Sequence, residues 1–196
     1  PAGAGRGRDG RGLTVDTPEA LTLNGRDYAV LRLLGKGKGG YTYLAERDGA
    51  RYALKQIHHE PCDYYRFGDK LAAELGDYEK LSALGVPIPR LLDVDREQER
   101  LLKELLPGET VYRLVLRGAV EPWQLEQVRV LSETLRGAGW NIDWFPTNFM
   151  CREGTLYYVD YECNGYMEEW SFENWGIRYW SRTEEFDAYA REHGDI

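Results

Sequence analysis

The segment "LLGKGKGGYTYLAERDGARYALKQI", residues 33–57, determines how the rest of the chain is interpreted. It contains three glycines at the spacing Gly35-x-Gly37-x-x-Gly40, followed by Lys55 inside an apolar run. The glycines lie between two β-like stretches, whereas the glycine loop of a dinucleotide-binding fold leads from a strand into a helix. We therefore expect a glycine-rich β-hairpin, whose backbone N–H groups can close over phosphate because no side chain holds them away.

The surrounding residues predict a five-stranded antiparallel sheet with one inserted helix. The Asn24-Gly25 and Asp48-Gly49 pairs are typical of tight hairpin turns. A helix is expected from Asp63 to Leu84, because apolar side chains recur on one stripe and glycine and proline follow. The expected β segments are a short strand leading into a longer one across "LTLNGRDYAVLRLL", then "YTYLAE", "RYALKQI", "RLLDVD" and "RLLKELL".

The second half of the chain predicts mainly helices around a short hairpin. Pro122 suits a first helical turn, and apolar residues recur until Gly137. Two short strands are expected around Glu153-Gly154, and the aromatic-rich residues 168–193 are expected to form two helices. No long linker separates independent domains, so we expect a mobile tail at 1–12 and two lobes at 13–106 and 107–196.

Composition narrows the function classes. A net charge of −8 disfavours nucleic-acid partners and anionic membranes, and no apolar run approaches the roughly 20 residues that span a bilayer. No signal-peptide pattern is seen, and the expected location is cytoplasmic. Cys62, Cys151 and Cys163 show no C-x-x-C spacing, so neither a disulfide framework nor a zinc site is indicated.

Candidate charged and polar residues follow the glycine segment in a fixed order. Strand alternation places Lys55 on the face beneath the glycines, where Glu74 is the candidate partner because it shares the helix stripe, while Glu79 points aside. Asp143 and Asn148 then lie in a proline-containing loop, and Asp160 follows an apolar strand. The structural alternatives are solvated surface charges for Lys55 and Glu74, loop capping for Asp143 and Asn148, and a turn for Asp160.

This order resembles the protein-kinase-like superfamily, over about residues 31–162. The resemblance implies an α+β, bilobal fold with a truncated helical second lobe, and an enzyme that uses ATP and magnesium. Lys55, held by Glu74, would contact the α- and β-phosphates under Gly35, Gly37 and Gly40, and backbone groups of Glu104 and Leu106 would read the adenine edge. Asp143 would act on the attacking hydroxyl of a protein or small-molecule acceptor, and Asn148 and Asp160 would hold magnesium.

The chain departs from the family pattern in several places. Asn141 and Ile142 stand where protein kinases have His-Arg, and Phe145 replaces a cationic residue near the transferred phosphate, a charge that Lys36 or Lys38 could supply. No Ala-Pro-Glu motif follows "DYE". The closer likeness is to minimal kinases of the RIO type and to aminoglycoside-phosphotransferase-like enzymes. A small atypical serine/threonine kinase is the first interpretation; a pseudokinase scaffold and a small-molecule kinase are the alternatives.

Overall fold

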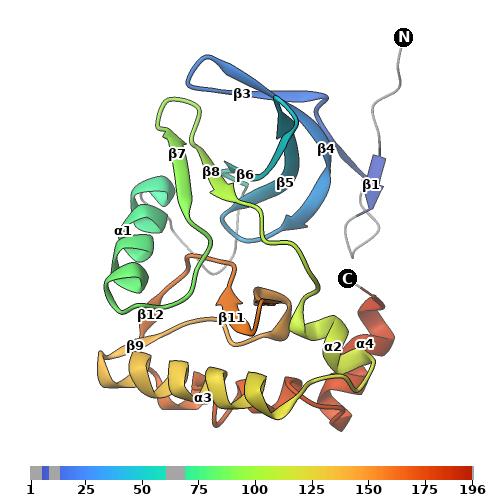
Figure 1. Ribbon diagram of the computed structural model, residues 1–196, viewed down its shortest axis with the longest axis vertical. Helices are drawn as coiled ribbons and strands as arrows, with labels where there is room; N and C mark the ends of the chain where they lie inside the picture. Colours follow the sequence, from blue (N-terminus) through green and yellow to red (C-terminus); the bar gives the residue numbers. More distant parts are fainter. Residues whose placement is uncertain (1–5, 9–13, 61–68, 196) are drawn as a thin grey trace. The chain divides into compact units, whose positions relative to one another are not determined.

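A computed structural model describes residues 6–8, 14–60 and 69–195 (Figure 1). The chain forms two compact units, each described by itself below. The first contains Pro1–Ala73 and Arg90–Leu105, and the second contains Glu74–Pro89 and Leu106–Ile196.

The first unit is built on a curled antiparallel sheet of six strands in the order β3-β4-β5-β6-β8-β7 (Figure 1). The expectation of five strands was wrong, because the short strand before Asn24-Gly25 pairs with β4 as an edge strand and buries Leu21 and Leu23. A separate pair joins β1 (Arg6–Arg8) to β2 (Thr14–Asp16). The sheet strands are β3 (Ala20–Leu23), β4 (Arg26–Lys36), β5 (Gly40–Arg47), β6 (Ala50–Ile57), β7 (Leu91–Asp95) and β8 (Arg100–Glu104).

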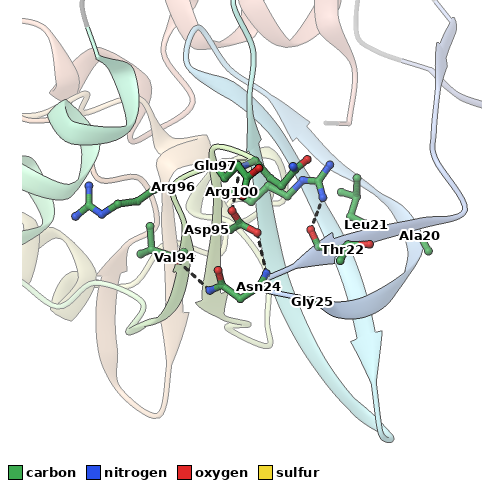
Figure 2. A pocket seen from close by; sticks show the side chains of 11 residues that line it. Ala20, Leu21, Thr22, Asn24, Gly25, Val94, Asp95, Arg96, Glu97 and Arg100 are labelled. Atoms are coloured by element: carbon green, nitrogen blue, oxygen red, sulfur yellow. Dashed lines mark hydrogen bonds between the residues drawn. The ribbon is translucent and has the colours of Figure 1, made fainter.

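The two edge strands of this sheet, β3 and β7, are joined at their turns. The backbone N–H of Asn24 donates to the Asp95 carboxylate at 2.7 Å, and the Asn24 side-chain amide donates to the Val94 carbonyl at 3.0 Å. The Arg100 guanidinium reaches the Thr22 carbonyl beside them (Figure 2). A hollow of about 870 Å³ lies next to these contacts. Polar contacts thus hold together the two sheet edges beyond the strand pairing itself.

Helix α1 spans Lys70–Ala83 in the structure, whereas the expected helix began at Asp63. The Asp69 carboxylate accepts from the N–H of Ala72 at 2.8 Å, the geometry of an N-cap. Residues 63–68 of the expected helix lie outside the described residues. The helix ends as expected before Gly85, which has a φ of 71°.

The second unit surrounds a core of aromatic and aliphatic side chains. Helix α3 (Pro122–Gly137) follows the expected pattern and buries Val128, Leu131 and Leu135. Its Gln127 contacts the hairpin of β10 (Phe149–Arg152) and β11 (Thr155–Tyr158), accepting from the N–H of Leu156 at 2.8 Å. The remaining elements are α2 (Val111–Leu116), β9 (Trp140–Asn141), β12 (Asn164–Gly165), α4 (Glu184–His193) and 3₁₀ turns at Pro146–Asn148, Glu168–Trp170 and Gly176–Tyr179.

The expectation of two helices over residues 168–193 was half right. Only α4 is an α-helix, and the preceding "EEWSFENWGIRYW" forms 3₁₀ turns. Close packing accounts for the irregular path: Phe172 and Trp180 are buried, and a Cβ at Gly176 would lie 2.6 Å from the Cβ of Trp144. Aromatic packing rather than helical periodicity therefore determines this segment.

Candidate functional site

The glycine segment forms the turn between β4 and β5. The N–H of Gly37 donates to the Gly40 carbonyl at 2.9 Å, which closes the turn. Gly40 is required by packing, because a Cβ there would lie 2.3 Å from the Gln56 carbonyl oxygen. A Cβ at Gly35 or Gly37 would meet no atom within 4 Å. The first two glycines therefore leave open space at the turn, whereas the third lets β5 approach β6.

Lys55 lies beneath this turn. It stands on β6 opposite Thr42 of β5 and Leu101 of β8, and its side chain is only 8% exposed. The Nζ atom is 3.7 Å from the position that a Cβ of Gly39 would occupy. A buried lysine thus has its ammonium close to the backbone of a glycine turn, and a cation beside backbone N–H groups can bind an anion.

The two lysines of the turn differ in their surroundings. The Lys36 ammonium forms an ion pair with Glu60 at 2.9 Å and lies 5.0 Å from the centre of the Tyr41 ring. The hydrogen bond with Glu60, followed by that with Tyr41, raises the pKa of Lys36 to about 12. Lys36 is therefore engaged with Glu60 and Tyr41 at the base of the glycine turn.

The expected adenine-reading residues lie where the two units join in sequence. The N–H of Glu104 donates to the Arg90 carbonyl at 2.9 Å, and the Glu104 side chain accepts from the guanidinium of Arg90 at 3.2 Å. The N–H is thus committed within the first unit, and any base contact made by the Glu104 backbone would have to use its carbonyl group. Leu106 is the first residue of the longer segment of the second unit, and it is buried.

In the second unit, Asp143 lies between β9 and the 3₁₀ turn Pro146–Asn148. Its carboxylate accepts from the N–H of Phe145 at 3.0 Å, and its backbone carbonyl accepts from the side-chain amide of Asn148 at 3.4 Å. The first contact is the capping role raised as the structural alternative for Asp143. The second holds Asn148 against the same loop, so the two residues, five positions apart, are brought together.

Asp160 follows the residue that pairs with Asn148 at the open end of the β10–β11 hairpin. The N–H of Val159 donates to the Asn148 carbonyl at 2.9 Å, which extends the strand pairing by one step and places Asp160 directly beyond. The Asp160 carboxylate also accepts from the N–H of Tyr161 at 2.8 Å. Because the Asn148 amide nitrogen is turned toward Asp143, its amide oxygen points elsewhere.

These donors fit a magnesium ion that is completed by phosphate. Carboxylate and amide oxygens are hard ligands, and Mg²⁺ commonly takes one or two of them together with substrate phosphates. Within residues 6–8, 14–60 and 69–195, no group of three His, Cys, Asp or Glu side chains could hold a metal ion.

A residue that the sequence did not single out, Tyr158, organises this region. Its side chain is fully buried, and its hydroxyl donates to the Glu162 carbonyl at 3.0 Å. Burial raises the pKa of Tyr158 well above its usual value, and the charges of Asp160, Asp143 and Glu162 raise it further. One phenol is therefore near all three carboxylates. The alternation of residues along β11 indicated that Tyr158 is buried. The contact of its hydroxyl with polar groups arises only from the tertiary fold.

Phe145 belongs to an aromatic cluster rather than to a charged site. Its ring centre lies 4.7 Å from that of Tyr189 and 5.1 Å from that of Tyr179. Packing thus explains why this position carries an aromatic side chain. In the nearby aromatic segment Trp180 is buried, whereas Trp170 is 48% exposed, so this segment supplies both core and surface.

Helix α1 contributes Glu74 to the second unit. Glu74 is buried, whereas Glu79 is exposed, which agrees with the helix phase expected from the stripe. Further along α1, the Asp77 carboxylate accepts from the N–H of Cys163 at 3.2 Å, and the Tyr78 ring centre lies 4.8 Å from that of Tyr161. The helix is thus fastened to the segment that follows Asp160. The pairing of Glu74 with Lys55 stays a prediction.

Comparisons with known proteins add no family to this description. No protein-family model matches the chain, and a search of curated proteins finds no match. Of the helices in the described part of the chain, none has the length and apolar character needed to cross a membrane.

Proposed function

We propose that the chain is an ATP- and magnesium-dependent phosphotransferase that acts on a hydroxyl acceptor, as a small atypical serine/threonine protein kinase. The observation that carries the proposal is the buried Lys55 ammonium beneath the open glycine turn. A triphosphate-binding site requires two features: a cation, and a turn whose backbone N–H groups are not covered by side chains.

Each unit would supply part of the chemistry. Lys55 would bind the α- and β-phosphates, and Glu74 would orient it. In the second unit, Asp143 would hold the acceptor hydroxyl and take its proton, while Asn148 and Asp160 would hold magnesium. The ion would supply neutralising charge to the triphosphate. The proposal requires that both units act on one nucleotide.

A pseudokinase is the second candidate, and specific contacts favour it. Asp143 and Asp160 each accept a hydrogen bond from a nearby backbone N–H, as residues that merely cap turns do. Phe145 is part of an aromatic cluster, so the cation usual at this position is absent. A small-molecule kinase differs only in the acceptor and would retain all the proposed residues.

Transfer of label from γ-labelled ATP tests the proposal. The protein would be incubated with magnesium and either serine/threonine peptides or a panel of sugars and aminoglycosides, and labelled products would be separated. A labelled peptide supports the protein kinase, and a labelled small molecule supports the third interpretation. Nucleotide binding without labelled product, in every panel and in the protein itself, would support the pseudokinase.

A further inference from the structure

His58, the residue that follows β6, lies against the glycine turn. The backbone N–H of His58 donates to the Gly39 carbonyl at 3.3 Å, and the His58 ring Nε2 contacts the Gly37 carbonyl at 3.1 Å. The N–H of Glu60 approaches His58 Nδ1 at 3.3 Å. Since a carbonyl only accepts and a backbone N–H only donates, Nε2 is the ring nitrogen that donates here and Nδ1 is the one that accepts.

These two carbonyl contacts orient the turn. In a trans peptide the C=O and the following N–H point in opposite directions, and the described residues contain no cis peptide. Because the carbonyls of Gly37 and Gly39 are drawn toward His58, the N–H groups of Lys38 and Gly40 are directed away from it. His58 thus determines which way two backbone donors of the turn point.

Glu60 fastens the strands at the base of the same turn. Its carboxylate contacts the Lys36 ammonium at 2.9 Å and accepts a hydrogen bond from the Tyr41 hydroxyl. Lys36 and Tyr41 face each other across β4 and β5 as the last paired residues before the turn. The ring of Tyr41 also lies 5.1 Å from that of His58, centre to centre. One carboxylate therefore bridges both strands where the turn begins.

We infer that His58 and Glu60 are positioning residues that hold the glycine turn in its phosphate-binding conformation. They act through the backbone of Gly37 and Gly39 and through Lys36 and Tyr41, and they are not proposed to touch the nucleotide. The inference rests on the proposed function for its consequence, which is tighter ATP binding. Its structural half, the holding of the turn, concerns the first unit alone.

Amide hydrogen exchange and Mg-ATP titration on Glu60→Ala and Glu60→Gln test the inference. In the ligand-free protein, exchange over residues 36–41 should rise about tenfold in Glu60→Ala, because an ion pair and a hydrogen bond are both lost. Glu60→Gln retains an acceptor for Tyr41, so a rise of roughly two- to fivefold is expected. The Kd for Mg-ATP should rise by similar factors. The KM for ATP should also rise, and kcat should change little.

Glu99→Gln is the matched control, because Glu99 pairs with the neighbouring His59 at 2.6 Å instead of with the glycine turn. It alters the contact of a nearby carboxylate with a different side chain, and exchange over 36–41 should stay as in the wild type. Equal exchange over 36–41 in the Glu60 and Glu99 variants would overturn the inference. If the wild type does not bind Mg-ATP but exchange over 36–41 is still faster in the Glu60 variants, His58 and Glu60 keep their role in holding the turn and the proposed function is rejected.

Discussion

At the scale of single residues, Asp143 and Asp160 share a neighbour but have different surroundings. Both contribute negative charge at the buried Tyr158 hydroxyl. Asp143 lies in the loop that also holds the Asn148 amide, whereas Asp160 follows the strand that ends at Tyr158. Under the proposed function, Asp143 would meet the acceptor, and Asp160 would hold magnesium together with Asn148. Substitution of each carboxylate should therefore give a different kinetic result.

Asp143→Asn should lower turnover by roughly 10²–10⁴ with ATP affinity retained, because an amide cannot take the proton of the hydroxyl. Asp160→Asn should weaken both nucleotide affinity and turnover, and added magnesium should partly restore them. Steady-state kinetics at several magnesium concentrations distinguish the two variants. Equal effects on turnover and ATP affinity in Asp143→Asn would contradict the separate roles.

At the scale of elements, the glycine turn combines a packing requirement with an open face. Gly40 has no room for a methyl group because of the Gln56 carbonyl, whereas a Cβ at Gly37 would meet no atom within 4 Å. Glycine is thus present at Gly40 because the strands pack closely, and at Gly37 because it leaves space at the turn. Stability and nucleotide binding should respond separately to the two glycines.

Gly40→Ala should destabilise the fold by about 1–3 kcal/mol, because the strands must separate to admit the methyl group. Gly37→Ala should leave the free energy of unfolding within about 1 kcal/mol of wild type. It should nevertheless weaken Mg-ATP binding, because its methyl group occupies the space proposed for phosphate. Denaturant unfolding and ATP titration of both variants provide the test, and unchanged affinity in Gly37→Ala would argue against a phosphate cover.

The joined edges of the sheet predict a dependence on pH. Hydrogen bonds from the backbone of Asn24 and Gln98 lower the pKa of Asp95 below its usual 3.8. Folding therefore favours the ionised carboxylate, and this contribution is present above about pH 4 and is lost as the pH falls through the lowered pKa. Thermal unfolding of wild type and Asp95→Asn should show a stability difference at pH 6 that shrinks toward pH 3. A difference independent of pH would exclude a role for the charge.

Local rules predicted the elements whose pattern is periodic or whose turns need special residues. The α3 repeat and the turns at Asn24-Gly25 and Glu153-Gly154 are of this kind, and both turns show positive φ. The short strand Ala20–Leu23 was expected from its hairpin turn but was not counted in the five-stranded sheet, and so short a strand gains its stability by pairing, here with β4. The roles of Tyr158, His58 and Glu60 could not be predicted, since each depends on groups brought together by the tertiary fold.

At the scale of the whole molecule, each unit has a core of its own. Leu23, Leu54 and Leu102 belong to the first, and Trp144, Phe149 and Trp180 belong to the second. The proposed site draws Lys55 from the first unit and Asn148 and Asp160 from the second. Mg-ATP should therefore stabilise both units, whereas a ligand of the glycine turn alone would stabilise only the first.

The distribution of tryptophan makes this prediction measurable. All six tryptophans follow residue 122, so intrinsic fluorescence during heating reports on the second unit, while far-UV circular dichroism reports on the whole chain. At Mg-ATP near 100 times Kd, stabilisation should approach ~2.7 kcal/mol and raise both unfolding midpoints.

Lys55→Met, a change in the first unit, should remove most of the shift seen by tryptophan fluorescence. The reason is that Lys55 and the second unit would bind the phosphates of the same nucleotide in a single binding event. A Lys55→Met protein with the full fluorescence shift would show that Lys55 contributes little to nucleotide binding, and no shift by either probe at millimolar Mg-ATP would remove the nucleotide site.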